Sequence, residues 1–164
     1  MEWTKLFRSR GKGNADISGS YNFRCLSDTV TTSGVVGAER LSRLAEDGYS
    51  ALINLLPDDS QHAVPDEKAL VTGQGLRYVY IPVDWDAPAR DDFDAFCAAM
   101  DTLDGGKVHI HCAANFRVSA FYGLYAAGRG TWSWQEAEAN IRSLWNPEEF
   151  PAWKSLIDSV RAET

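Results

Sequence analysis

The sequence predicts a three-layer α/β sandwich in which helices cover both faces of a mostly parallel sheet of four or five strands. Short apolar runs at 51–55, 78–81 and 108–111 alternate with segments of helical periodicity. This alternation is typical of a parallel sheet that is buried on both faces. Glycines such as Gly48 stand between a helical segment and the next apolar run. A glycine at that point is a common helix C-cap, so each helix is expected to end just before a strand.

The length and composition indicate one domain. The chain has 164 residues, of which 45% are hydrophobic and 24% charged, as in a soluble globular protein. We expect residues 1–15 to form a flexible basic N-terminal segment and residues 16–164 to form a single domain. No apolar run is long enough to cross a membrane, and the basic start lacks the apolar core of a signal peptide. The oligomeric state is not readable from the sequence.

The cysteine content favours a reduced, cytoplasmic setting. Cys25, Cys97 and Cys112 cannot all pair, and their spacing matches no zinc site. Cys97 continues an apolar helical stripe and Cys25 lies in a predicted strand. Both are therefore expected to be core residues.

The charge distribution excludes two classes of partner. The net charge is −7, and residues 1–12 hold four Lys/Arg and one Glu, so the rest of the chain carries −10. A body this acidic repels nucleic acid and anionic membranes, and we expect neither as a partner. Any bound anion must be held by local dipoles and a few basic side chains.

The elements are predicted in order from apolar spacing. The runs at 21–26 and 30–32 read as two short strands, added as a pair at one edge of the sheet. Pro65 can occupy a first helical position before 66–71. Ser133 and Glu136 fit a capping box. Helical spacing is found at 41–45, 66–71, 93–103, 118–125, 137–145 and 153–160. These stripes are interpreted as core.

One segment carries chemistry, the run His-Cys-Ala-Ala-Asn-Phe-Arg-Val-Ser at 111–119. It joins the strand at 108–111 to the following helix, and ligands of open parallel sheets bind at such carboxyl ends of strands. Free N–H groups at a helix start bind anions, and the same dipole should lower the pKa of the Cys112 thiol. Arg117 can hold a tetrahedral oxyanion through paired hydrogen bonds. Thiolate, amides and arginine together suit attack on phosphorus.

This segment resembles the signature loop of the cysteine-dependent protein tyrosine and dual-specificity phosphatases, His-Cys-x-x-Gly-x-x-Arg-Ser/Thr. The likeness extends loosely over 20–160, and includes Ile-Pro-Val at 81–83 and Pro88 ahead of the loop. More narrowly, the chain is similar to a bacterial branch of small phosphatase-like proteins with His-Cys-x-x-Asn-x-Arg-Val-Ser-Ala. The resemblance implies hydrolysis of phosphomonoesters through a phosphocysteine, without metal or organic cofactor. It also implies a phosphorylated protein or small phosphate ester as substrate, with phosphate or sulfate ion binding at the loop.

The resemblance assigns roles to the loop residues. Cys112 attacks phosphorus, Arg117 binds the phosphate, and Ser119 aids departure of the thiolate. His111 orients the loop through backbone hydrogen bonds. The oxygens are cradled by the backbone amides of Ala113, Ala114, Asn115, Phe116 and Arg117.

The spacing between cysteine and arginine departs from the main family, with four intervening residues where the family has five. Either one residue is deleted and Arg117 is the family arginine, or Asn115 takes the glycine position and Val118 the arginine position. We favour the second alignment, because asparagine tolerates a positive φ and Ser119 then keeps the family spacing. Arg117 is then one place early, about 100° round the helix start.

The general acid also departs from the pattern Ile-Pro-Val-x-Asp, because Trp85 stands where the family has aspartate. Asp84 and Asp86 flank it, and a loop can shift by one residue. We favour Asp86, which lies further from the strand and nearer Pro88, as the group that protonates the leaving oxygen. Both could instead be solvated loop carboxylates.

Three other readings use the same residues. A Cys-x-x-x-x-Arg loop of this length resembles the persulfide loop of rhodanese-type sulfurtransferases, although the His-Cys pair favours phosphatases. A loop with Arg117 or its acid poorly placed would recognise phosphate without cleaving it, as a pseudophosphatase does. His109, His111 and Cys112 could form a metal site, but no carboxylate motif accompanies them, and we expect none.

Overall fold

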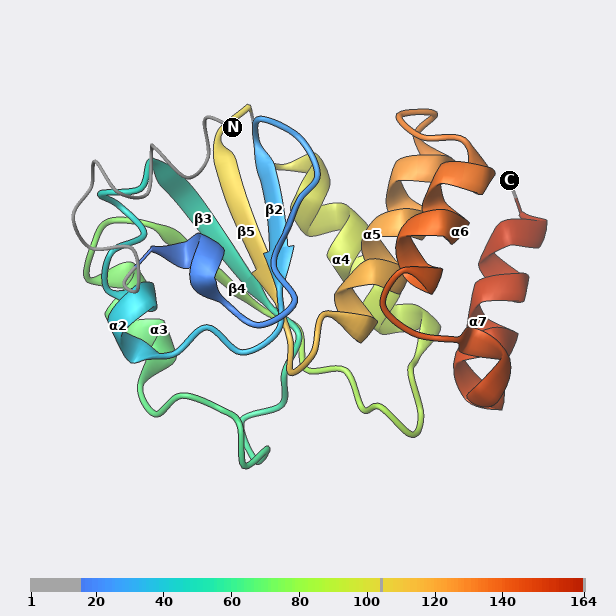
Figure 1. Cartoon of the computed structure of the whole chain (residues 1–164), viewed down its shortest axis with the longest axis horizontal. Helices are drawn as coiled ribbons and strands as arrows, with labels where there is room; N and C mark the ends of the chain where they lie inside the picture. Colours follow the sequence, from blue (N-terminus) through green and yellow to red (C-terminus); the bar gives the residue numbers. More distant parts are fainter. Residues whose placement is uncertain (1–15, 104, 164) are drawn as a thin grey trace.

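The computed structural model describes residues 16–103 and 105–163, so the predicted flexible segment at 1–15 lies outside the described residues. It contains one five-stranded sheet, ordered β1-β2-β5-β3-β4 (Figure 1). The strands are β1 (Arg24–Cys25), β2 (Val30–Ser33), β3 (Tyr49–Asn54), β4 (Arg77–Tyr80) and β5 (Lys107–His111). All neighbours are parallel except β1 and β2. The predicted mostly parallel sheet, with an added pair at one edge, is confirmed.

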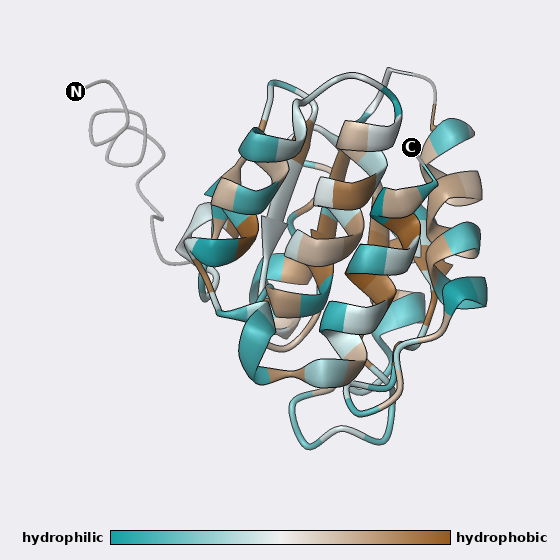
Figure 2. Cartoon of the chain, turned by 90° about the vertical axis from the view of Figure 1, so that its right-hand side faces the viewer, coloured by the Kyte–Doolittle hydropathy of each residue, from teal (hydrophilic) through white to brown (hydrophobic). Residues whose placement is uncertain are grey.

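Helices cover both faces of the sheet (Figure 1). One face carries the short helices α2 (Ala38–Leu41) and α3 (Glu67–Thr72), which pack on a core that includes Leu44 and Leu52. The other face carries a thicker helical layer, and Figure 2 shows both hydrophilic and hydrophobic residues on its helices. The helix that follows β5 is buried along most of its length. The members of this layer are α4 (Arg90–Asp101), α5 (Phe116–Gly128), α6 (Trp134–Arg142) and α7 (Pro151–Ala162). Short 3₁₀ helices lie at η2 (Ile17–Gly19) and η3 (Pro147–Glu149).

The position of β5 decides where the site can be. It is the central strand, paired with β2 on one side and β3 on the other. In this register His111 lies between Ser33 and Asn54, so three strands end together at one edge of the sheet. The loop that follows β5 therefore leaves from the middle of that edge, where open parallel sheets bind ligands.

Local details correct some of the expectations. Pro65 does not begin a helix, because Asp66 adopts a left-handed conformation with φ 58° and α3 starts at Glu67. Cys25 is exposed and not a core residue, because its strand β1 is at the sheet edge and has a neighbour on one side only. Cys97 is partly buried, and this burial raises the pKa of its thiol. The predicted capping box of Ser133 and Glu136 is confirmed at the start of α6.

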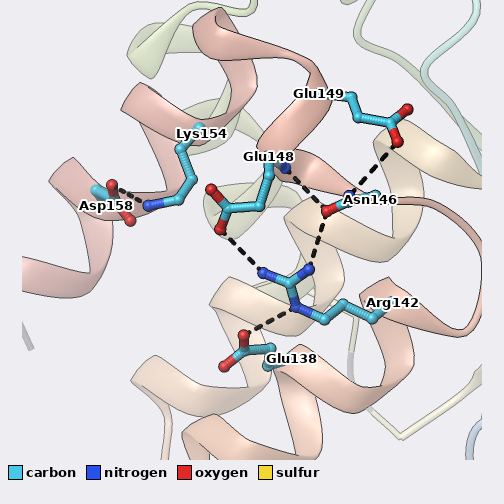
Figure 3. Close-up of polar contacts among 7 residues, drawn as sticks. All are labelled: Glu138, Arg142, Asn146, Glu148, Glu149, Lys154 and Asp158. Atoms are coloured by element: carbon cyan, nitrogen blue, oxygen red, sulfur yellow. Dashed lines mark hydrogen bonds and ion pairs between the residues drawn. The ribbon is translucent and has the colours of Figure 1, made fainter.

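A surface network joins the end of α6 to η3, and a separate ion pair of Lys154 and Asp158 lies within α7 (Figure 3). Arg142 of α6 donates hydrogen bonds to Glu138, Asn146 and Glu148, at 2.9, 2.9 and 3.1 Å. These side chains are about half exposed, so the ion pairs add little to stability. Across residues 16–103 and 105–163, no helix is long and apolar enough to span a bilayer.

Candidate active site

The loop between β5 and α5 presents a helix start without a side-chain cap. β5 ends at His111, α5 begins at Phe116, and the side chain of Asn115, the N-cap residue, makes no cap hydrogen bond. The N–H of Ser119 donates to the carbonyl of Asn115 at 3.0 Å. The N–H groups of the preceding residues of the first turn therefore have no helical acceptor. Unsatisfied N–H groups at the positive end of a 13-residue helix form an anion site.

Asn115 holds the loop in a left-handed turn. Its φ is 71°, as the alignment that gives it the family glycine position expects. Its side-chain N–H group donates to the carbonyl of Asn22 at 2.8 Å and to the hydroxyl of Thr32 at 3.0 Å. In return, the side chain of Asn22 donates to the carbonyl of Ala114 at 3.0 Å. Among the described residues, Oδ1 of Asn115 is buried without a partner, which leaves an acceptor that a water could satisfy.

A second segment approaches the loop closely after β2. The N–H of Val35 donates to the carbonyl of Ala113 at 3.0 Å, and Gly34 forms a bridge with Ala114. A Cβ atom on Gly34 would collide with the Ala113 oxygen and lie 2.8 Å from Cα of Ala114. Only glycine allows this approach, so the backbone of the loop is fixed from the β2 side.

Cys112 lies at the end of β5, beneath this loop. Its side chain is fully buried, and its N–H donates to the carbonyl of Ser33 at 3.3 Å. By contrast, Ala113, Ala114, Phe116 and Arg117 are all partly exposed. Cys112 belongs to the apolar core between the sheet and the thicker helical layer, and it is not among the residues that line the neighbouring pocket, which include Arg117.

Arg117 points toward the segment that precedes α4. Its Nε–H donates to the carbonyl of Val83 at 2.8 Å, and its guanidinium lies 5.6 Å from the ring centre of Trp85. Arg117 thus connects the cysteine loop to the segment that carries Asp84 and Asp86. The second alignment places Val118 in the family arginine position, and that side chain is fully buried.

Trp85 is an anchor for the segment 82–86. Its ring packs against an aromatic cluster, and its carbonyl accepts the indole N–H of Trp153 at 2.8 Å. The cluster consists of Phe116, Trp145, Phe150 and Trp153, at centroid distances of 5.0–6.0 Å from Trp85. A tryptophan at the position of the family aspartate therefore has a packing role, and it leaves Asp84 and Asp86 exposed on either side.

Asp84, Asp86 and Arg117 share one pocket of about 440 Å³, whose wall includes Asp59. The Asp84 carboxylate accepts the N–H of Asp86 at 2.9 Å, so one of its oxygens is used within the segment. Asp59 belongs to the loop after β3, and sequence reasoning missed it because nothing in the sequence predicts which way that loop folds.

Ser119 is one turn into α5, on its buried side. Its hydroxyl donates to the carbonyl of Phe116 at 2.8 Å and accepts the indole N–H of Trp145 at 2.9 Å. In this arrangement the serine proton is directed at the helix backbone, and Trp145 links α5 to the C-terminal aromatic cluster.

The two strand histidines face the α2–α3 side and have different surroundings. His109 is fully buried between the hydroxyls of Thr31 and Ser33, each 2.8 Å from a ring nitrogen. Burial, followed by the charges of His111 and Lys107, lowers its pKa well below the ordinary value, so the ring is neutral. His111 instead bonds to Glu67 of α3, with Nε2 2.7 Å from Oε2. Within the described part of the chain, no three His, Cys, Asp or Glu side chains could hold a metal ion.

Comparison with known proteins bears on this loop and fold. The family "Beta-lactamase hydrolase-like protein, phosphatase-like domain" matches residues 22–129. The chain belongs to this family. The predicted resemblance to phosphatase-like proteins is confirmed. A comparison with curated protein sequences gave no match.

Solved structures resemble the phosphatase-like domain over most of its length. A DUF442 protein from Shewanella putrefaciens CN-32, described as a candidate phosphatase, is 38% identical, with a TM-score of 0.82 over 92% of this chain and 97% of that one. TpbA from P. aeruginosa, solved with pTyr, is 16% identical, with a TM-score of 0.65 over 87% and 89%. The catalytic core of the PP-IP phosphatase SIW14 from S. cerevisiae, solved with citrate, is 14% identical, with a TM-score of 0.67 over 85% of each chain. These neighbours confirm the predicted fold.

Proposed function

We propose that this phosphatase-like domain hydrolyses phosphomonoesters through a covalent phosphocysteine on Cys112. The observation that carries the proposal is the placement of Cys112 between the central strand and the uncapped start of α5. A thiolate at this point is stabilised by the helix dipole, and the amides of 113–117 can bind the oxygens of a phosphate.

The reaction has two steps. The Cys112 thiolate attacks phosphorus, and the bond from phosphorus to the ester oxygen breaks as that oxygen takes a proton from a carboxylic acid. Water then attacks the phosphocysteine, giving its proton to the same carboxylate, and phosphate leaves as the thiolate re-forms. Arg117 supplies positive charge for the phosphate oxygens. Ser119, whose hydroxyl accepts the indole N–H of Trp145, aids departure of the thiolate.

Asp86 is the proposed acid. It shares the pocket with Arg117, and Asp84 already uses one carboxylate oxygen to hold the segment together. An acid protonates the leaving oxygen only where that oxygen needs help. We therefore expect Asp86→Asn to lower kcat about 100-fold on a phenyl ester, whose phenoxide leaves poorly without a proton, and far less on a p-nitrophenyl ester. Asp84→Asn should lower both rates equally and only slightly.

Phosphate recognition without turnover is the second candidate. It is favoured by one contact, the bond from Arg117 Nε to the Val83 carbonyl, which directs the guanidinium to the segment 82–86. Turnover of p-nitrophenyl phosphate, abolished in Cys112→Ser, supports the enzyme. Saturable binding of vanadate without turnover supports the recognition module. Transfer of sulfur from thiosulfate to cyanide would contradict both.

The substrate class follows from the pocket beside the loop. Asp59, Asp84 and Asp86 surround a single arginine, so the mouth is acidic. This charge opposes substrates with several phosphates and suits a single phosphate ester on a neutral or basic phosphorylated protein or small molecule.

A further inference from the structure

A cavity outside the candidate active site lies between α3 and the edge strand β4. Its volume is about 650 Å³, and its walls are formed by Asp58, the segment 63–68, Tyr78 and Tyr80. The chain between β3 and α3, which supplies several of these residues, runs past the ends of the strands (Figure 1). A volume of this size is typical of pockets that bind small organic groups.

The loop after β3 forms part of both this cavity and the pocket of the candidate active site. Asp58 lines the cavity, whereas its neighbour Asp59 lines the pocket that contains Arg117. In the sheet, Tyr80 is opposite Asn54, which in turn is opposite the last residue of β5. Two strand spacings, or about 10 Å, therefore separate Tyr80 from the end of β5. An extended peptide covers about 10 Å in three residues, so one peptide can reach both places.

The charges on the walls of the cavity favour a cation. Asp58, Asp66 and Glu67 contribute three carboxyl groups, and Lys68 contributes one amine. In residues 16–103 and 105–163, no three His, Cys, Asp or Glu side chains are arranged to hold a metal ion. These carboxyl groups are therefore better suited to an organic cation, whose N–H groups can reach carboxylates that lie apart.

Glu67 adds a hydrogen-bond acceptor to the wall of the cavity. Its side chain is only 5% exposed, and its Oε2 lies 2.7 Å from Nε2 of His111. Among the described residues, its other carboxyl oxygen has no hydrogen-bond partner. An acceptor at a nearly buried position is satisfied by a donor that enters the cavity.

Two neutral tyrosine rings complete the walls. The hydroxyl of Tyr78 accepts a side-chain N–H of Asn54 at 3.0 Å, and that of Tyr80 accepts the backbone N–H of Asp58 at 2.8 Å. Burial raises the pKa of both hydroxyls, and the charge of Asp58 raises it further, so both rings stay uncharged at neutral pH. A guanidinium group stacks on such rings more readily than an ammonium group does.

The same combination of groups binds an arginine elsewhere in this chain. The guanidinium of Arg129 lies 4.6 Å from the ring centre of Tyr125, and its Nη2 donates to Oδ2 of Asp101 at 2.6 Å. A tyrosine ring beside an aspartate thus holds a guanidinium by stacking and by a charged hydrogen bond.

We infer that the cavity binds the side chain of an arginine that lies about three residues from the phosphorylated residue of a bound protein. The guanidinium stacks on the tyrosine rings and donates to the carboxylates of Asp58 and Asp66. This role in selecting a phosphorylated protein rests on the proposed function, whereas the binding of the guanidinium does not.

Binding is tested with N-acetylarginine methylamide and with the same compound made from citrulline, the neutral isostere of arginine. Backbone amide NMR signals of the unsubstituted protein are followed as each compound is added. We expect the arginine compound to shift the signals of 58–68 and 78–80, and the citrulline compound to bind about tenfold more weakly. Equal binding of the two compounds, or no shift at these residues, would overturn the inference.

Two matched variants test the role of the charge in the cavity. Asp66→Asn removes one carboxylate from the wall, and Asp28→Asn makes the same change at an exposed site between β1 and β2. Both positions are exposed, so neither change should unfold the protein. We expect Asp66→Asn to weaken binding of the arginine compound about threefold and Asp28→Asn to leave it unchanged. Equal effects of the two variants would contradict a local role for Asp66.

Phosphotyrosine peptides test whether one ligand occupies both places. The peptides carry either arginine or citrulline, three residues before or three residues after the phosphotyrosine. In one of the two directions, kcat/KM should be about tenfold higher with arginine, and this preference should fall about threefold in Asp66→Asn and persist in Asp28→Asn. Equal rates with arginine and citrulline in both directions would overturn the inference.

Two further outcomes distinguish the source of the cation and the fate of the proposed function. Agmatine, a free guanidinium compound, should bind more weakly than the arginine peptides, and tighter binding of agmatine would overturn the assignment to a bound protein. If the arginine compound occupies the cavity but no phosphate ester is turned over, the guanidinium site stands and the proposed function fails. If phosphate esters are turned over with no response to arginine, the proposed function stands and this inference fails.

Discussion

Asn22 and Asn115 are linked by hydrogen bonds around the loop that follows Cys112, although they are 93 positions apart. Asn115 donates to the Asn22 carbonyl at 2.8 Å, and Asn22 donates to the Ala114 carbonyl at 3.0 Å. Both residues adopt left-handed conformations, with φ of 53° and 71°. The turn that shapes the loop is thus held by a segment from the start of the domain.

Two substitutions of Asn115 distinguish the free-energy cost of backbone strain from the cost of the lost hydrogen bonds. Asn115→Ala should lower the free energy of unfolding by about 2–4 kcal/mol, because alanine is strained at positive φ and two bonds are lost. Asn115→Gly loses the same bonds without the strain, so its loss should be about 1–2 kcal/mol smaller. Urea denaturation measures both. Equal losses would show that the left-handed turn is not important for stability.

Trp85 stands where the resemblance to tyrosine and dual-specificity phosphatases leads us to expect an acid, and placing an aspartate there should harm the protein. Trp85→Asp removes the aromatic anchor shared with Trp145 and Trp153, and should cost about 3 kcal/mol of stability and most of the activity. Trp85→Phe should retain most of both. The variants are compared by urea denaturation and hydrolysis of p-nitrophenyl phosphate. A more active Trp85→Asp protein would disprove the packing role.

Gly34 allows the segment after β2 to approach the loop closely. Gly34→Ala should shift the backbone at 113–114, because a Cβ atom has no room there. We expect a stability loss of about 1–3 kcal/mol and weaker vanadate binding than in the unsubstituted protein. Isothermal titration measures the binding. Full vanadate affinity in Gly34→Ala would mean that this approach does not shape the anion site.

Because the ring of His109 is buried and neutral, we expect the folded protein to lose stability in mild acid. Its folded pKa is well below its unfolded value of about 6.5, so the unfolded chain binds the proton more readily. Stability from the neutral ring is therefore complete above about pH 6.5 and falls with pH below it, by about 1.4 kcal/mol per unit. Urea midpoints at several pH values should show this slope, and His109→Phe should reduce it. His62→Gln, at an exposed site, should keep the slope.

The fold could be predicted from the sequence because its pattern is local. Apolar strands that follow a glycine, and helical stripes such as Phe93–Phe96, are set by residues near one another in the chain. Details that depend on distant neighbours could not be predicted. The exposure of Cys25 follows from the position of β1 at the edge of the sheet, and the start of α3 from the left-handed Asp66.

The candidate site shows the same contrast between features set by consecutive residues and features set by residues far apart in the chain. The loop from His111 to Ser119 was identified because its residues are consecutive, and the left-handed Asn115 followed from alignment with a glycine. Glu67, Asn22 and Asp59 were missed, since only the folded chain brings them to the loop. The orientation of Arg117 was left open by the sequence, because it is decided by the carbonyl of Val83, 34 positions away.

The central claim is that the buried sulfur of Cys112 is the nucleophile, and trapping the covalent adduct tests it most directly. The protein is mixed with an aryl phosphate, quenched in acid within a turnover, and digested for mass spectrometry. The account predicts a phosphate group on the peptide that contains Cys112, and none in Cys112→Ser. Turnover without this adduct, or turnover that survives in Cys112→Ser, would contradict it.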